Sequence, residues 1–153
     1  MSRAGPEDAT RLHASTVAFL LDDGWHGVLI SGRSGAGKSE LALELIALGA
    51  RLVADDQTLL MREGAGVIAS APAQIRGMIE MRGLGIMAAQ VIDAVPVVLR
   101  VDLDRAAHER LPDLQHSDIL GARIATLHRV ESRAFPAALR QYMLSRHWLK
   151  GHE

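Results

Sequence analysis

The sequence predicts an α/β domain with a mixed, partly antiparallel sheet, one helix after a glycine-rich loop and a second helix near the C-terminus. Three observations lead to this fold class. Short segments of β-forming residues outnumber the two segments with helical periodicity. The glycine-rich loop at 32–39 stands between an apolar run and a helical repeat, which is the order strand, loop, helix. Several strand segments are separated only by turn residues, which favours antiparallel hairpins over a long alternating βαβ series.

The first third of the chain predicts two strands and a helix. Residues 17–21 form the first strand, a turn at 22–24 reverses the chain, and residues 25–30 return as the second strand. Leucines then recur at helical spacing, which predicts a helix from about 38 to 48. Gly49 follows the last of these leucines, where a glycine that ends a helix belongs.

The middle of the chain predicts further strands. Residues 51–54 are a short apolar strand that ends in two aspartates. Residues 58–62 and 67–70 have the pattern of a hairpin closed by the glycine-rich turn at 63–66. Residues 95–103 are strongly β-forming and predict one long buried strand.

The C-terminal third predicts one strand and the second helix. Residues 105–117 carry mixed charge and Pro112, so we expect a loop or a short helix there. Residues 119–130 are expected to hold one more strand. Pro136 suits the first turn of a helix whose apolar face continues to about Trp148.

Composition describes one globular domain. The 153 residues are 48% hydrophobic and 23% charged, with a net charge of −1 and no cysteine. These values exclude disulfides and thiol catalysis, and they give no electrostatic case for nucleic acid or an anionic membrane. We expect a flexible terminus at 1–10 and a single domain at 11–150. Because no apolar run reaches about 20 residues and residues 1–11 are unlike a signal peptide, we expect a cytoplasmic protein.

The loop at 32–39 matches the phosphate-binding P-loop pattern G-x-x-x-x-G-K-S. Backbone N–H groups of such a turn close around phosphate oxygens, and the following helix adds the positive end of its dipole. In this interpretation Lys38 contacts the β- and γ-phosphates of ATP and Ser39 binds Mg²⁺; the alternative is a chance glycine turn before a helix. The candidate nucleotide-binding residues of the loop are Gly32, Arg33, Ser34, Gly35, Ala36, Gly37, Lys38 and Ser39.

Two adjacent carboxylates follow the strand at 51–54. Ligands of open α/β sheets collect at the carboxyl ends of strands, so Asp55 and Asp56 are expected near the nucleotide. Neighbouring residues of a regular strand face opposite sides, so we expect one carboxylate to face the nucleotide and the other a second partner, unless the strand has already ended. Either could bind Mg²⁺ or accept a proton. The alternative is a pair of surface turn residues.

The stretch from Glu80 to Gly85 is the next unusual segment. Glu80 and Arg82 share a face if the segment is extended, and one could hold Mg²⁺ while the other binds a phosphate oxygen. The two close glycines indicate that the backbone approaches another group. Taken alone, the stretch is equally compatible with an ordinary salt-bridged strand end.

Two further residues have chemistry suited to such a site. His13 precedes the first strand and is a side chain that exchanges protons near neutral pH, although taken alone it is more typical of a surface position. Arg110 could neutralise charge on a transferring phosphoryl group, although its sequence context favours a solvated loop. The other histidines have no metal-ligand spacing and receive no role.

Taken together, these segments resemble the catalytic domain of the bacterial HPr kinase/phosphorylase family. Four stretches carry the resemblance: 12–15, 32–40 with the helix that follows, 52–56, and 79–86. The last stretch reads Ile-Glu-Met-Arg-Gly-Leu-Gly-Ile, close to the family signature Leu-Glu-Ile-Arg-Gly-Leu-Gly-Ile. A phosphate loop alone is shared by many families, whereas this order of motifs is much more specific. The resemblance is clear over residues 12–112.

The resemblance implies an ATP- and Mg²⁺-dependent protein-serine kinase. Its substrate is expected to be HPr, the carrier protein of the sugar phosphotransferase system, or a paralogue, and the assembly a hexamer. By position Asp56 is expected to be the general base, with Lys38, His13 and, in a loose alignment, Arg110 also in the active site. The remaining implied contacts are Ser39 and Glu80 as ligands of Mg²⁺, and Asp55 and Arg82 in the nucleotide site.

The chain departs from the family pattern in two respects. The usual N-terminal domain is not expected here, as in short forms of alphaproteobacteria. The basic loop that the family associates with dephosphorylation is represented only by Arg129 and Arg133, so kinase activity is expected more than phosphorylase activity. Two alternatives stay open, a small-molecule P-loop kinase and a regulator that senses nucleotide without transferring phosphate.

Overall fold

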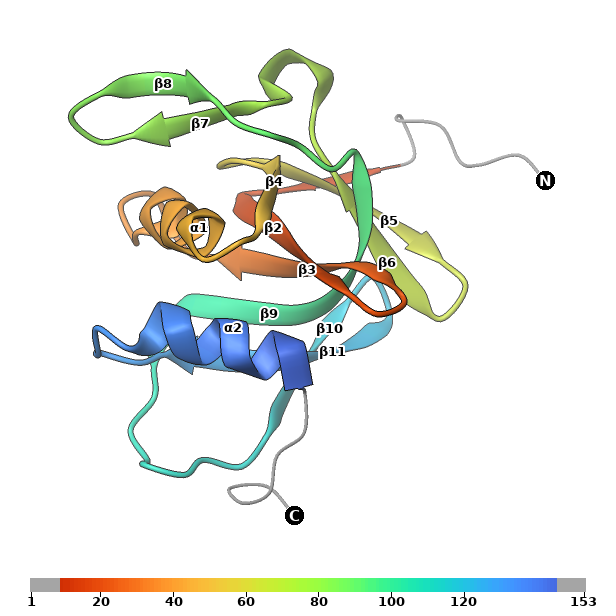
Figure 1. Ribbon diagram of the computed structural model, residues 1–153. Helices are drawn as coiled ribbons and strands as arrows, with labels where there is room; N and C mark the ends of the chain where they lie inside the picture. The colour runs from red at the N-terminus through yellow and green to blue at the C-terminus, as the bar shows by residue number, and fades with distance from the viewer. Residues whose placement is uncertain (1–8, 146–153) are drawn as a thin grey trace.

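A computed structural model describes residues 9–145 of the chain. Its elements form a nine-stranded sheet, a separate two-stranded hairpin and two α-helices (Figure 1). Three expectations extend outside the described residues, namely most of the flexible terminus at 1–10, the end of the second helix near Trp148, and the domain boundary at 150. In chain order the elements are β1 (Thr10–Leu12), β2 (Ala14–Leu21), β3 (Gly24–Ser31), α1 (Lys38–Ala47), β4 (Arg51–Ala54), β5 (Thr58–Glu63), β6 (Gly66–Ser70), the 3₁₀ turn η2 (Ala73–Ile75), β7 (Met78–Met81), β8 (Gly85–Ala88), β9 (Ala94–Ala106), β10 (Gln115–Ile119), β11 (Ala122–Arg129) and α2 (Phe135–Ser145).

The large sheet is mixed, as the sequence predicted. Its strand order is β1-β5-β6-β9-β3-β2-β4, with β11 also paired to β9 and β10 paired to β11. The β2–β3, β5–β6 and β10–β11 pairs are antiparallel hairpins. The long strand β9 pairs in parallel with both β3 and β11, and in antiparallel fashion with β6 near its start. The sheet is therefore parallel only around β9.

Two hydrophobic cores lie on opposite sides of this sheet. The first joins α1 and α2 to the sheet through side chains such as Leu45, Leu139 and Ile30. The second joins the strands of the other face through residues such as Leu29 and Leu60. Alternation along β2 and β3 sends successive side chains to the two cores, so these strands are apolar on both faces. Figure 1 shows both helices together on one side, with the β7–β8 hairpin next to α1.

The helix after the P-loop has well-defined ends. It begins after Gly37, whose φ of 101° lies in the left-handed region. At its other end the N–H of Ala50 donates to the carbonyl of Leu45, and the N–H of Gly49 donates to Ile46, both at 3.0 Å. Gly49 has a φ of 109°. These bonds form a Schellman motif, which confirms the predicted role of Gly49.

The structure corrects three boundaries. Thr10, placed by the sequence in the flexible terminus, begins β1. Within 105–117 the loop is shorter than expected, because β9 continues to Ala106 and β10 begins at Gln115. The single strand expected in 119–130 is instead the second half of a hairpin, turned at Leu120 and Gly121. Both turn residues have positive φ, 52° and 83°, and leucine in such a turn is an unusual choice that the pattern could not predict.

Neither α-helix among residues 9–145 has the length and apolar character needed to cross a membrane.

Candidate active site

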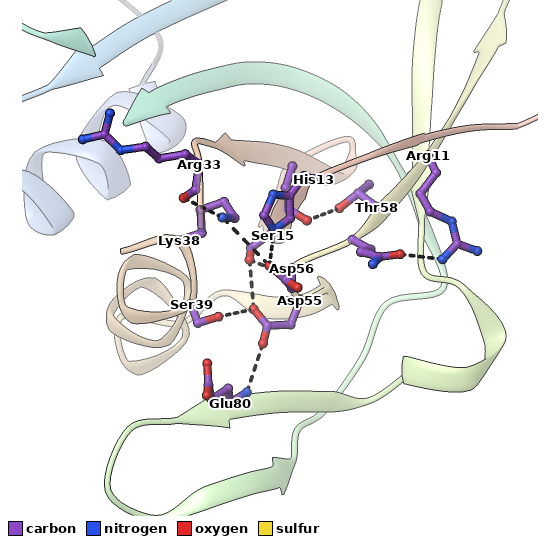
Figure 2. A network of polar contacts seen from close by, with 12 residues as sticks. Arg11, His13, Ser15, Arg33, Lys38, Ser39, Asp55, Asp56, Thr58 and Glu80 are labelled. Carbon is purple, nitrogen blue, oxygen red and sulfur yellow. Dashed lines mark hydrogen bonds and ion pairs between the residues drawn. The ribbon is translucent and has the colours of Figure 1, made fainter. Parts of the chain in front are cut away.

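A cavity of about 380 Å³ lies where the P-loop, the end of β4 and the β7–β8 hairpin meet. These three elements come from separate parts of the chain, and Figure 2 shows the side chains of Lys38 and Ser39 directed toward Asp55 and Asp56. The walls combine backbone of the glycine loop with four carboxylates and several apolar side chains. The lining residues are Ser34, Gly35, Gly37, Lys38, Ser39, Glu40, Asp55, Asp56, Ile75, Met78, Glu80, Arg82 and Ile86.

The P-loop forms a tight turn at the carboxyl end of β3. A Cβ atom on Gly32 would lie 3.0 Å from the Cβ of Ala36 and 3.2 Å from that of Leu103, so any other residue would crowd both neighbours at this start of the loop. By contrast, a Cβ on Gly35 would meet nothing within 4 Å. The N–H of Arg33 donates to Asp104 at 3.1 Å, which fixes the loop to the end of β9. The loop is therefore closely packed on the sheet side and open toward the cavity.

Lys38 is held at the bottom of the cavity. Its side chain is only 4% exposed, and Nζ donates to the carbonyl of Arg33 at 3.1 Å. The same Nζ lies 3.9 Å from Oδ1 of Asp56. In Figure 2 the guanidinium of Arg33 extends away from the two aspartates, so this residue contributes its backbone, not its charge.

Asp55 connects three elements. Its buried carboxylate accepts hydrogen bonds from Ser15 Oγ at 2.9 Å, from Ser39 Oγ at 2.6 Å and from the backbone N–H of Glu80 at 3.0 Å. These donors belong to β2, α1 and β7 respectively. Ser39 and Glu80, the expected Mg²⁺ ligands, are thus both joined to Asp55, a link that the sequence did not indicate.

Asp56 occupies a strained turn at the mouth of the cavity. Its φ is 65°, and the N–H of Gln57 donates to the carbonyl of Asp55 at 2.7 Å, which closes a γ-turn with Asp56 at its centre. Its own N–H donates to Ser15 Oγ at 3.0 Å. Its side chain is 58% exposed, and Oδ1 lies 2.7 Å from Nε2 of His13. Because β4 ends at Ala54, the carboxylates of Asp55 and Asp56 both reach the same cavity. The sequence predicted that they would face opposite sides unless the strand had already ended, and the strand has ended.

His13 lies between β1 and β2, and its ring is 46% exposed. The sequence alone favoured a surface position, and the structure adds a direct contact with Asp56. Ser15, two residues later, was missed by sequence reasoning. Its signal was weak: it stands beside Thr16 in a mostly apolar strand, where it is fully buried with its hydroxyl bonded to Asp55.

Glu80 and Arg82 both line the cavity, but they do not share a strand face. The strand β7 ends at Met81, and Arg82 lies in the turn that follows. That turn is closed by the N–H of Leu84, which donates to Met81 at 2.9 Å. The Arg82 guanidinium is exposed and lies 3.8 Å from the carboxylate of Glu40, the residue after Ser39.

Arg110 is not brought to this cavity. It is an exposed residue in the loop between β9 and β10, which Figure 1 draws on the opposite side of the molecule from the β7–β8 hairpin. Of the other predicted residues, Gly32, Arg33 and Ala36 support the loop from outside the lining. His13 lies outside the lining and reaches the site through Asp56, whereas the remaining predicted residues contribute to the walls.

The donor set of the cavity suits Mg²⁺. Ser39 Oγ and the carboxylates of Asp55 and Glu80 are hard oxygen ligands. Within the described part of the chain, no group of three or more His, Cys, Asp or Glu side chains is arranged to hold a metal by itself. Mg²⁺ is usually bound through one or two carboxylates, completed by waters and substrate phosphates.

The sequence is similar to a known family of kinases. The family model described as HPr Serine kinase C-terminal domain matches residues 9–126. The HPr kinase/phosphorylase of Alkaliphilus metalliredigens is 41% identical over 131 residues, or 77% of this chain and 42% of that protein. That of Cupriavidus necator is 38% identical over 141 residues, or 79% of this chain and 44% of that protein.

A solved structure agrees with the sequence match. The HPr(Ser) kinase/phosphatase from Coxiella burnetii matches with a TM-score of 0.72 and 28% sequence identity, covering 88% of this chain and 93% of that chain. The chain spans less than half the length of the two curated relatives above. The family match itself includes the P-loop, Asp55, Asp56 and Glu80. The chain therefore belongs to the HPr Serine kinase C-terminal domain family.

Proposed function

We propose that this domain is an ATP- and Mg²⁺-dependent protein-serine kinase that phosphorylates HPr or a paralogue of HPr. The observation that carries the proposal is the position of Asp56. An exposed carboxylate stands at the mouth of a phosphate-loop cavity, 3.9 Å from the loop lysine and 2.7 Å from a histidine. Such a group is available to a hydroxyl that comes from another protein, and it is close enough to the loop to act on a γ-phosphate.

The proposed reaction is direct phosphoryl transfer. The loop N–H groups and Lys38 hold the β- and γ-phosphates of ATP. Asp56 accepts the proton of the acceptor serine as the serine oxygen bonds to the γ-phosphorus and the bond to the leaving ADP breaks. His13, bonded to the same carboxylate, keeps Asp56 oriented. Arg82 stands at the rim, where its guanidinium can contact phosphate oxygens.

Ser39 and Glu80 are the proposed Mg²⁺ ligands, and Asp55 positions both of them. When bound, the ion would neutralise charge that develops on the phosphate oxygens. Asp55 accepts from the Ser39 hydroxyl and from the Glu80 backbone, so it sets the distance between the two ligands.

Arg110, in the loop beyond β9, would reach a transferring group only if that loop moved toward the cavity.

Phosphorylation of HPr is the direct test. Purified protein with ATP, Mg²⁺ and HPr should yield phosphoserine, detected by mass. Asp56→Asn should lower the rate by roughly 10²- to 10⁴-fold, the usual contribution of a general base, and should retain ATP binding. An Asp56→Asn variant as active as the wild type would show that the base is another group.

The same assay separates the alternatives. A nucleotide-sensing regulator would bind Mg·ATP and leave HPr unmodified, whereas a small-molecule kinase would consume ATP with a metabolite and ignore HPr. Phosphorylase activity is tested by incubating phosphoserine-HPr with inorganic phosphate and looking for pyrophosphate. Arg129 and Arg133 line a hollow beside Gly37 and are the residues to substitute if that activity is found.

A cytoplasmic location and a hexameric assembly complete the proposal. The resemblance implies the hexamer. Light scattering of the purified chain tests the assembly directly, and a monomer at micromolar concentration would remove that part of the proposal.

A further inference from the structure

A second cavity of about 300 Å³ opens on the other side of the two aspartates. It shares Asp55, Asp56 and Ile75 with the first cavity, so these residues form a common wall. Its remaining walls come from β1, from the residue before β5 and from the segment around η2. The complete lining is Arg11, Asp55, Asp56, Gln57, Pro72, Gln74 and Ile75.

The two cavities differ in what they offer to a ligand. Figure 2 shows Lys38 and Ser39 on one side of the aspartates and Arg11 on the other. The first cavity therefore holds the phosphate-binding groups, and the second contains none of the P-loop. In phosphoryl transfer the attacking and leaving oxygens lie roughly in line, on opposite sides of the phosphorus. The groups that bind the acceptor serine must then lie on the side of Asp56 that is away from the P-loop.

The second cavity is rich in hydrogen-bond donors. Arg11 donates from Nη1 to the side-chain oxygen of Gln57, and among the described residues this leaves the Gln57 amide N–H₂ group and the other N–H groups of Arg11 for a ligand. Within residues 9–145, no carboxylate pairs with Arg11. The exposed side chain of Gln74 adds a further amide. This set of donors fits a ligand that offers oxygen acceptors.

Gln57 links this cavity to the proposed base. Its N–H closes the γ-turn around Asp56, and its side chain receives the hydrogen bond from Arg11. A ligand that binds Arg11 and Gln57 is therefore held one residue away from Asp56.

We infer that the second cavity is the subsite for the polypeptide segment that carries the acceptor serine. Arg11 and Gln57 bind carbonyl or carboxylate oxygens of that segment and bring the serine hydroxyl to Asp56. The inference rests on the proposed kinase function and adds to it a binding role for residues outside the P-loop and its carboxylates.

Steady-state kinetics with ATP and HPr as varied substrates test the inference. Arg11→Ala should raise KM for HPr about tenfold, because a hydrogen bond from a charged donor is lost, and should leave KM for ATP and kcat close to the wild type. Arg123→Ala, which removes an exposed arginine on β11, is the matched control and should change neither KM. Unchanged KM for HPr in Arg11→Ala, in an otherwise active enzyme, would overturn the inference and leave the kinase function standing.

A second variant guards against loss of structure around β1. Gln74→Glu keeps the backbone and places a negative charge among the donors, so it should also raise KM for HPr and leave ATP binding unchanged. If Arg11→Ala is unstable, unchanged KM for HPr in Gln74→Glu overturns the inference.

The dependence of KM on salt concentration shows whether Arg11 binds a carboxylate or a carbonyl oxygen of HPr. A carboxylate partner makes KM for HPr rise with ionic strength in the wild type and not in Arg11→Ala, whereas carbonyl partners give no such difference. A wild-type protein that leaves HPr unmodified and does not bind it in calorimetry would refute the proposed function and this inference together. Binding without transfer, weakened by Arg11→Ala, would retain the subsite and refute only the kinase activity.

Discussion

Asp56 combines an unfavourable backbone with a chemically useful position. A φ of 65° places an L-residue in the left-handed region, which costs of order 1–3 kcal/mol. The γ-turn bond from Gln57 and the bond from Ser15 to the Asp56 N–H keep it there. The consequence is that the carboxylate leaves the line of β4 and faces solvent beside His13 and Lys38.

The strain can be measured with two substitutions at Asp56. Both Asp56→Ala and Asp56→Gly remove the carboxylate, but only glycine adopts positive φ without steric cost. The glycine variant should therefore be about 1 kcal/mol more stable than the alanine variant in urea unfolding. Both should have lost phosphoryl transfer. Equal stability of the two variants would show that the turn relaxes when the side chain is removed.

At the scale of single residues, the sequence predicted the side chains with distinctive chemistry, but it did not predict the residues that orient those side chains. Lys38 and Ser39 are specified by the P-loop pattern, and the cavity contains both. Ser15 was not predicted, since a hydroxyl inside a strand gains its meaning only from Asp55, forty residues away in the chain. The γ-turn at Asp56 was equally hidden, because an Asp-Asp pair does not specify a left-handed residue.

At the scale of elements, the β7–β8 hairpin is a small sheet fastened to the domain by few contacts. Ile79 is fully buried in the core that contains α1, whereas Leu84 and Ile86 are 75% and 71% exposed. The bond from the Glu80 N–H to Asp55 and the exposed Arg82–Glu40 ion pair are polar contacts of this attachment. Through the bond to Asp55 the position of the hairpin is coupled to Ser39 at the start of α1.

Asp55→Asn should loosen this attachment. Asparagine has one side-chain oxygen where aspartate has two, so its N–H₂ group must face one of the groups that now donate to Asp55. That buried donor is then left unpaired, which costs about 1–3 kcal/mol. We expect that loss in urea unfolding and faster hydrogen exchange at the Glu80 amide. Asp113→Asn, in the exposed loop after β9, is the matched control. An unchanged Glu80 exchange rate would show that the Asp55 carboxylate does not hold the hairpin in place.

Elements were predictable where local patterns are strong. The β2–β3 and β5–β6 hairpins, β9, α1 and α2 follow from apolar runs separated by turn residues, and the structure confirms them. The β10–β11 hairpin was missed because Gln115 to Asp118 are polar and the turn residues are Leu120 and Gly121. Its stability comes from pairing with β9, which is a tertiary effect.

At the scale of the whole molecule, the P-loop, β4 and β7 meet only in the folded domain, so we expect nucleotide binding and folding to be coupled. Saturation with Mg·ATP at about a hundred times Kd should add about 2.7 kcal/mol of stability. For a domain of this size that corresponds to a rise in Tm of about 5–10 °C. Differential scanning fluorimetry measures it.

Lys38→Met is the control for this melting experiment. It removes the phosphate-binding charge and keeps an unbranched apolar side chain in a position that is 4% exposed. Its Tm should rise much less with Mg·ATP. A full rise in this variant would mean that the nucleotide binds elsewhere.

The bond between Arg33 and Asp104 also has a consequence for the order in which the protein is made. The ribosome completes the whole glycine motif long before it adds Asp104 at the far end of β9. Until β9 arrives, β3 has no parallel neighbour, and the loop has no carboxylate to hold its first N–H. We therefore expect a nascent chain to carry the P-loop sequence without the P-loop conformation while residues 40–104 are added, and to acquire competence for nucleotide only when β9 inserts between β3 and β6.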